Sequence, residues 1–68
     1  MGMTRLERKA AFKAAVTLQD ISMAQAARRL GVSYNHLMLV INGARSGSER
    51  LRQAFAAFVR RPEREIFG

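Results

Sequence analysis

The sequence predicts a compact all-α domain of four to five short helices, and three observations support this prediction. Residues that commonly open helices recur along the chain, glycines stand where helices would end, and apolar residues follow a helical spacing. Since 68 residues can build one modest core, we expect a single domain over residues 3–68. Met1 and Gly2, ahead of a second methionine, could be an addition to the natural chain.

The predicted helix starts rest on hydroxyl residues followed three positions later by Glu or Gln. In this capping box the hydroxyl accepts a hydrogen bond from the N3 amide, and the N3 side chain accepts one from the cap amide. Three pairs have this spacing: Thr4 with Glu7, Ser22 with Gln25, and Ser46 with Glu49. Ser33 is a further N-cap candidate, and Pro62 suits the first position of a short last helix.

The predicted helix ends rest on Gly31 and Gly43, which stand where left-handed residues end helices. Starts and ends together predict helices over 5–18, 23–30, 34–42 and 47–60, with a turn at 62–66. Apolar spacing agrees with most of them, although in the first helix Leu6 and Ala10 lie off the main stripe. The candidate core comprises Phe12, Ala15, Val16, Met23, Ala26, Ala27, Leu30, Leu51, Ala54, Phe55 and Phe58.

The charge of the chain favours a polyanionic partner. Twelve Lys and Arg residues stand against five Asp and Glu, which gives a formal net charge of +7. Ten of the twelve cations are Arg, whose planar fork suits phosphate and guanine edges. Simple solubility, or a compositional preference for Arg, is the alternative explanation.

Several classes of protein are not expected from this sequence. No apolar run has the length of a membrane span, and the first residues lack the apolar core of a secretion signal, so we expect a cytoplasmic, nucleoid-associated protein. With no cysteine and a single histidine, His36, no metal site and no nucleophile–base pair are expected. We therefore expect neither an enzyme nor a cofactor or small-molecule ligand.

Residues 23–42 have the features of a helix-turn-helix, in which two short helices cross steeply at a tight turn. The crossing needs a small residue on the first helix, which Ala27 supplies, and the turn needs one that accepts positive φ, which Gly31 supplies. Leu37 and Val40 would anchor the second helix through their i, i+3 spacing. Each match alone is weak, whereas the full set at this spacing is fairly specific.

The stretch ISMAQAARRLGVSYNHLMLVINGARSGSERLRQAFAAF resembles the lambda-repressor-like (Xre/Cro) helix-turn-helix family. The resemblance rests on Ile21, Ser22, Ala27, the run Arg28-Arg29-Leu30-Gly31-Val32-Ser33, Leu37, Val40, Asn42 and Gly43. The chain departs from the family pattern at Met23, Met38, Leu39, Ile41 and Ala44, where polar or charged residues are common. The resemblance implies a five-helix fold and a transcriptional regulator, most often a repressor, that binds double-stranded DNA.

The resemblance also implies which residues would face the major groove. Tyr34, Asn35, Met38 and Leu39 lie on the groove-facing positions of the second helix in the family register. Asn35 could pair with adenine, Tyr34 could contact a phosphate or sugar, and Met38 and Leu39 could contact thymine methyl groups. Tyr34 could instead cover the turn, and Met38 could instead belong to the core.

Contacts to the DNA backbone would come from helix starts and from the loop after the second helix. Ser22 and Ser33, at helix N-termini, could hold phosphates, and His36 could contact one or be merely exposed. In the family, the loop containing Asn42, Arg45 and Ser46 lies on the backbone. Arg50, Arg52, Arg60, Arg61 and Arg64 are expected away from the groove or at its edge, where they would serve solubility.

Three alternatives remain open at this stage. A homodimer could form through apolar residues left exposed near Phe67, or the last turn could cover the core of a monomer. The apolar run 37–41 covers more than one helix face, so the same fold could be a protein-binding module, such as an antitoxin or antirepressor. The charge alone would also suit a nonspecific nucleic-acid binder.

Overall fold

The computed structural model describes residues 2–68, and within them it contains five helices and no strand. The helices are α1 (Arg5–Gln19), α2 (Met23–Arg29), α3 (Tyr34–Ile41), α4 (Glu49–Val59) and α5 (Glu63–Phe67). Each expected element is present, with ends displaced by at most two residues. The all-α prediction is therefore confirmed.

Capping interactions define most of the helix starts. Both expected capping boxes at α1 and α2 are present: Thr4 Oγ1 and Ser22 Oγ each accept from an N3 amide at 3.1 Å, and each N3 side chain accepts in return at 2.8 Å. Ser33 caps α3, as expected, by accepting from the amide of His36. These bonds satisfy amides that a helix start otherwise leaves without partners.

The expected capping box between Ser46 and Glu49 is wrong. The cap of α4 is Ser48, whose Oγ accepts from the amide of Leu51 at 3.1 Å. Gly47 adopts a φ of +74°, so the chain turns out of a helical path just after Ser46 and the helix begins later. Pro62 is likewise the N-cap of α5 and not its first helical residue.

All four longer helices end in the same hydrogen-bonding pattern. After α2, the Gly31 amide donates to Arg28 O and the Val32 amide to Ala27 O; after α3, Gly43 and Ala44 repeat the arrangement. This is the Schellman motif, which requires a left-handed residue and so explains the two glycines, at φ +78° and +81°. Asp20 and Arg60 occupy the equivalent left-handed position after α1 and α4 without being glycine.

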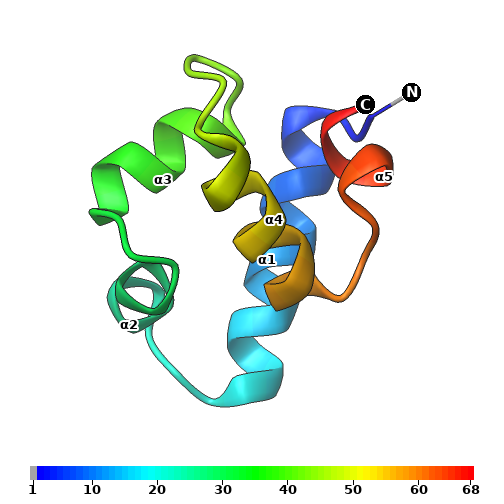
Figure 1. Cartoon of the computed structure of the whole chain (residues 1–68). Coiled ribbons are helices and arrows are strands. Elements are labelled where there is room, and N and C mark those ends of the chain that lie inside the picture. Colours follow the sequence, from blue (N-terminus) through cyan, green and yellow to red (C-terminus); the bar gives the residue numbers. More distant parts are fainter. Residues whose placement is uncertain (1) are drawn as a thin grey trace.

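All five helices contribute to the core, and its largest fully buried side chains are Phe12, Leu37, Ile41, Phe55 and Ile66. The Phe12 ring stacks on that of Phe55, with centroids 5.8 Å apart. Figure 1 shows α4 crossing in front of α1, with α2 and α3 on one side and α5 on the other. Since buried residues of α3 belong to this core, the core holds α3 against the other helices.

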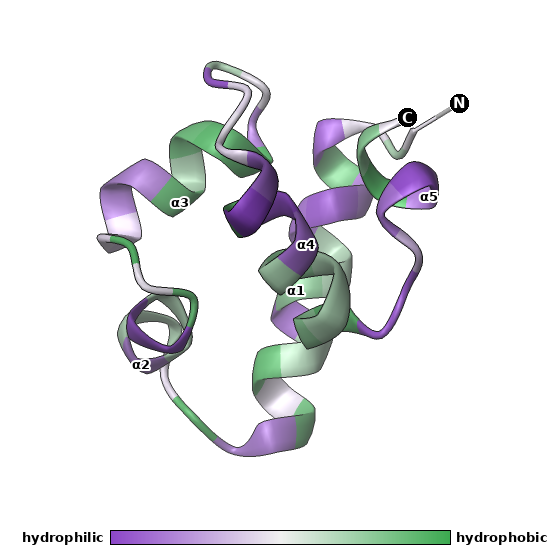
Figure 2. Ribbon diagram, viewed as in Figure 1, coloured by the Kyte–Doolittle hydropathy of each residue, from purple (hydrophilic) through white to green (hydrophobic). Residues whose placement is uncertain are grey.

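The segment just before α1 lies against α5. The Met3 amide donates to Ile66 O at 3.0 Å, which joins the segment before α1 to the last helix. Figure 2 shows that the second half of α3 is apolar, whereas its first turn is polar. None of the described helices is both long and apolar enough to cross a membrane.

Candidate nucleic-acid interface

The candidate interface begins with the arrangement of α2 and α3. In Figure 1 α2 is seen almost end-on while α3 lies across the view, so the two helices cross steeply. Ala26 and Ala27 are buried on the core-facing side of α2, with Ala27 only 1% exposed. Small side chains there allow the close approach that a steep crossing requires. The structure therefore contains the small residue and the positive-φ turn at the expected positions.

Helix α3 is held by one face and exposes another. Leu37, Val40 and Ile41 are buried, with Leu37 fully covered. On the exposed side Tyr34 and Leu39 retain 43% and 39% of their surface. Since Asn35 is also exposed, the start of α3 presents a phenol and an amide to solvent, followed one turn later by an aliphatic side chain.

Two residues of α3 that were expected to contact DNA, Met38 in the groove and His36 at a phosphate, are less accessible. Met38 is half-buried and packs against the core, which matches its alternative assignment as a core residue. His36 is half-buried as well, and its backbone amide belongs to the cap formed by Ser33. Tyr34, Asn35 and Leu39 are consequently the side chains of α3 best placed to touch a partner.

The expected phosphate-binding serines lie at exposed helix starts. Ser22 and Ser33 each use a hydroxyl oxygen to accept a cap hydrogen bond. A hydroxyl that accepts in this way keeps its own proton, which it can donate to a phosphate oxygen. The remaining amides of the first turn of α3 and the helix dipole favour an anion at the same place.

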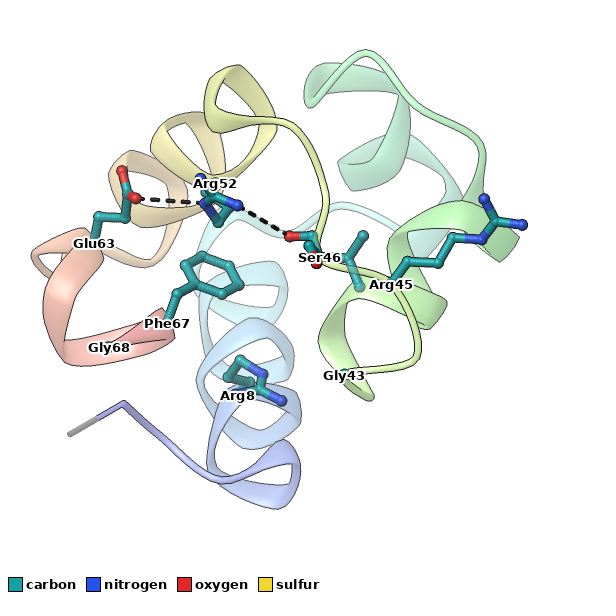
Figure 3. A pocket seen from close by; sticks show the side chains of 9 residues that line it. Arg8, Gly43, Arg45, Ser46, Arg52, Glu63, Phe67 and Gly68 are labelled. Carbon is teal, nitrogen blue, oxygen red and sulfur yellow. Dashed lines mark hydrogen bonds and ion pairs between the residues drawn. The ribbon is translucent and has the colours of Figure 1, made fainter.

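The loop between α3 and α4 carries the other expected backbone contacts. Asn42, Arg45 and Ser46 are all exposed in it. The amides of Ala44 and Arg45 both donate to Leu39 O, at 2.9 and 3.2 Å, so the last turn of α3 fixes the path of the loop. Figure 3 shows the Arg45 side chain extending outward, away from Arg8 and Arg52. Arg45 is therefore free to reach a phosphate.

Two arginines hold the two ends of this loop by hydrogen bonds to backbone carbonyls. Arg8 donates from Nε to Ile41 O at 2.8 Å and from Nη1 to Met3 O at 2.6 Å. Arg52 donates from Nη1 to Gly47 O at 3.2 Å. It also donates to Ser46 O at 3.5 Å and pairs through Nε with Glu63 at 3.5 Å, as Figure 3 shows. The two side chains line a cavity of about 400 Å³ under the loop.

The structure corrects the expected role of Arg52 and adds Arg8 to the residues that shape the site. Arg52 was expected to serve solubility, whereas it joins the loop and α5 to α4. Arg8 was not among the predicted site residues, although it lies four residues before buried Phe12 and so on the same side of α1. That spacing is the signal that could have identified it.

The charge distribution separates the motif from the rest of the chain. From residue 21 to residue 48 there is no Asp or Glu, while Arg28, Arg29 and Arg45 are exposed there. The five acidic residues lie in α1, α4 and α5 or at the end of α1. A stretch with cations and no anions repels no phosphate at close range, as a polyanion-binding surface requires.

Comparisons with family models, with curated protein sequences and with solved structures gave no match for this chain.

Proposed function

We propose that this chain is a sequence-specific DNA-binding transcriptional regulator of the lambda-repressor-like kind, acting as a repressor with α3 in the major groove. The observation that carries the proposal is the anchored helix α3, whose buried face is fixed by Leu37, Val40 and Ile41 while its first turn stays exposed. An α-helix fits the major groove of B-DNA, where each base pair shows a distinct pattern of donors and acceptors.

Each exposed side chain of α3 has a definite role in this proposal. Asn35 reads adenine through its amide, which can accept from N6 and donate to N7, and such a pair contributes about 1–3 kcal/mol of discrimination. Leu39 packs on a thymine methyl group, and Tyr34 donates its hydroxyl proton to a phosphate or sugar oxygen. Asn35 thus carries most of the sequence reading.

The phosphate contacts come from both sides of α3. Ser22 and Ser33 donate from the helix starts, and Arg45 and Ser46 donate from the loop that Arg8 and Arg52 support. Each neutralised phosphate adds about −0.9 to the slope of log K against log salt concentration. Regulation follows from occupancy of an operator, and we propose no catalytic step, metal or cofactor.

The experiment that tests this proposal is selection from a random double-stranded DNA pool, followed by anisotropy titration at two salt concentrations. The proposal expects one enriched sequence and a salt-dependent affinity. Equal affinity for all sequences, with the salt slope retained, would replace it by nonspecific nucleic-acid binding. No binding to any DNA would contradict both.

A second candidate function is favoured by one observation, the exposure of Leu39 beside Tyr34 on α3. An aliphatic and an aromatic side chain on one exposed helix are also what a protein partner would use. In that case Leu39→Ala would abolish partner binding and Asn35→Ala would leave it unchanged. If α3 reads DNA, Asn35→Ala should weaken DNA binding more than Leu39→Ala does.

A further inference from the structure

A groove runs between the second half of α1 and the end of α4, away from the proposed DNA-binding helices. Its volume is about 330 Å³, and most of the residues that line it are apolar: alanines and Leu18 of α1, with Phe58 and Val59 of α4. The polar residues Gln19, Arg60 and Arg61 complete the lining. No residue of α2 or α3 lines it. Since apolar cavities of about 150 Å³ can already hold a benzene ring, this groove is large enough for an aliphatic side chain.

Leu18 stands at the edge of this groove and is the most exposed large hydrophobic residue described, with 87% of its surface accessible. A leucine so exposed gains nothing from the hydrophobic effect in the isolated chain. The same surface therefore offers both a protruding apolar side chain and an apolar hollow beside it. This combination is what a surface needs in order to bind a copy of itself.

We propose that the groove is a homodimer surface in which Leu18 of each copy enters the groove of the other. A two-fold axis parallel to the groove brings the α1 rim of one copy against the α4 rim of its partner. In such a contact every interaction occurs twice, so Leu18 of each copy lies against Phe58 and Val59 of the other. The occupant is a second copy of this chain.

The charges on the two rims are complementary in this arrangement. The α1 rim ends at Asp20, and the α4 rim continues into Arg60 and Arg61. Among residues 2–68 neither Asp20 nor Arg60 forms an ion pair, while Arg61 reaches Glu65 only at 3.5 Å on the exposed surface. The two-fold contact gives Asp20 a cationic neighbour, although each copy carries a net charge of +7.

The surface near Phe67, where the sequence suggested a dimer contact, is less suitable. The Phe67 ring packs edge-on against Phe55, with centroids 5.7 Å apart, and Ile66 is fully buried. The last helix thus covers the core of its own chain. A dimer through the groove also leaves α3 exposed in both copies, since no residue of α3 lines the groove.

The test is sedimentation equilibrium without DNA over a wide range of protein concentration, for wild type, Leu18→Lys and Leu6→Lys. Leu6 is the matched control, because it is a leucine of the same helix, 70% exposed, and lies outside the groove. We expect wild type and Leu6→Lys to dimerise alike. Leu18→Lys should raise the dimer dissociation constant about tenfold or more, because an ammonium group would have to enter a groove lined by apolar side chains and by Arg60 and Arg61 of the partner copy.

Circular dichroism melting keeps the test informative, since both leucines are exposed and both variants should unfold near the wild-type temperature. A wild type that stays monomeric at every concentration would overturn the proposal, as would a folded Leu18→Lys variant that dimerises normally. The dimer needs no DNA in this assay. Dimerisation without DNA binding would therefore refute only the proposed function, and DNA binding by a strict monomer only the dimer.

Discussion

The Nε of Arg8 donates a hydrogen bond to the backbone carbonyl of Ile41, 2.8 Å away, and so joins α1 to the end of α3. A carbonyl in the last turn of a helix has no partner within the helix and carries part of the negative end of the helix dipole. The guanidinium supplies the missing hydrogen bond and places a positive charge at the negative end of the helix dipole. Through its second bond to Met3 O, Arg8 also ties the segment before α1 to this point.

Replacing Arg8 by Met should therefore destabilise the fold, although the side chain is only partly buried. Hydrogen bonds to a charged group contribute about 1.5–3 kcal/mol each, and two are lost. We expect a loss of about 2 kcal/mol or more in urea unfolding. Arg5→Met, on an exposed position of the same helix, is the control and should change stability little. Equal effects of the two substitutions would contradict the role of Arg8.

The start of α4 gives a paired prediction, because two serines stand two residues apart and only one is the cap. Ser48→Ala removes the hydrogen bond to the Leu51 amide and should cost about 1 kcal/mol. Ser46→Ala removes no cap bond and should be close to neutral. Thermal unfolding of both variants decides the matter. A larger loss for Ser46→Ala would restore the earlier start of the helix.

Two glycines allow a comparison of backbone strain with crowding. Gly31 and Gly47 both have positive φ, at +78° and +74°, so alanine at either position pays about 1–2 kcal/mol for the left-handed conformation. A Cβ at Gly31 meets nothing within 4 Å, whereas at Gly47 it would lie 3.2 Å from a methyl carbon of Val40. Chemical denaturation should therefore show Gly47→Ala to be the more destabilising. The opposite order would mean that Val40 can move aside freely.

Helix positions were largely predictable because their signals are local. The capping residues Thr4 and Ser22 form hydrogen bonds only to residues three positions away, and Gly31 ends α2 through bonds that are equally local. Sequence spacing therefore nearly determines where these helices begin and end. The predicted cap at Ser46 was wrong because the capping-box pattern considers only the spacing of Ser46 and Glu49. It does not show that Gly47, between them, adopts a positive φ.

The parts that could not be predicted depend on contacts between distant segments. The bond from Arg8 to Ile41 joins residues 33 positions apart. The spacing of Arg8 to Phe12 indicates on which side of α1 the guanidinium lies, but not which carbonyl it meets. The five apolar residues 37–41 cannot all be buried by one helix face, so the sequence alone could not show whether Met38 or Leu39 is the exposed side chain. In the structure α3 packs on the core so that Met38 is half-buried and Leu39 is exposed.

The most direct test of the proposed function is the affinity of Asn35→Ala for the selected DNA sequence and for a scrambled one. Gln53→Ala, which removes an exposed amide on α4 outside the proposed contacts, is the matched control. We expect Asn35→Ala to lose about 1–3 kcal/mol on the selected sequence, with little change on the scrambled one and an unchanged salt slope. Gln53→Ala should bind like wild type. If Asn35→Ala kept the full sequence preference, α3 would not be the reading helix.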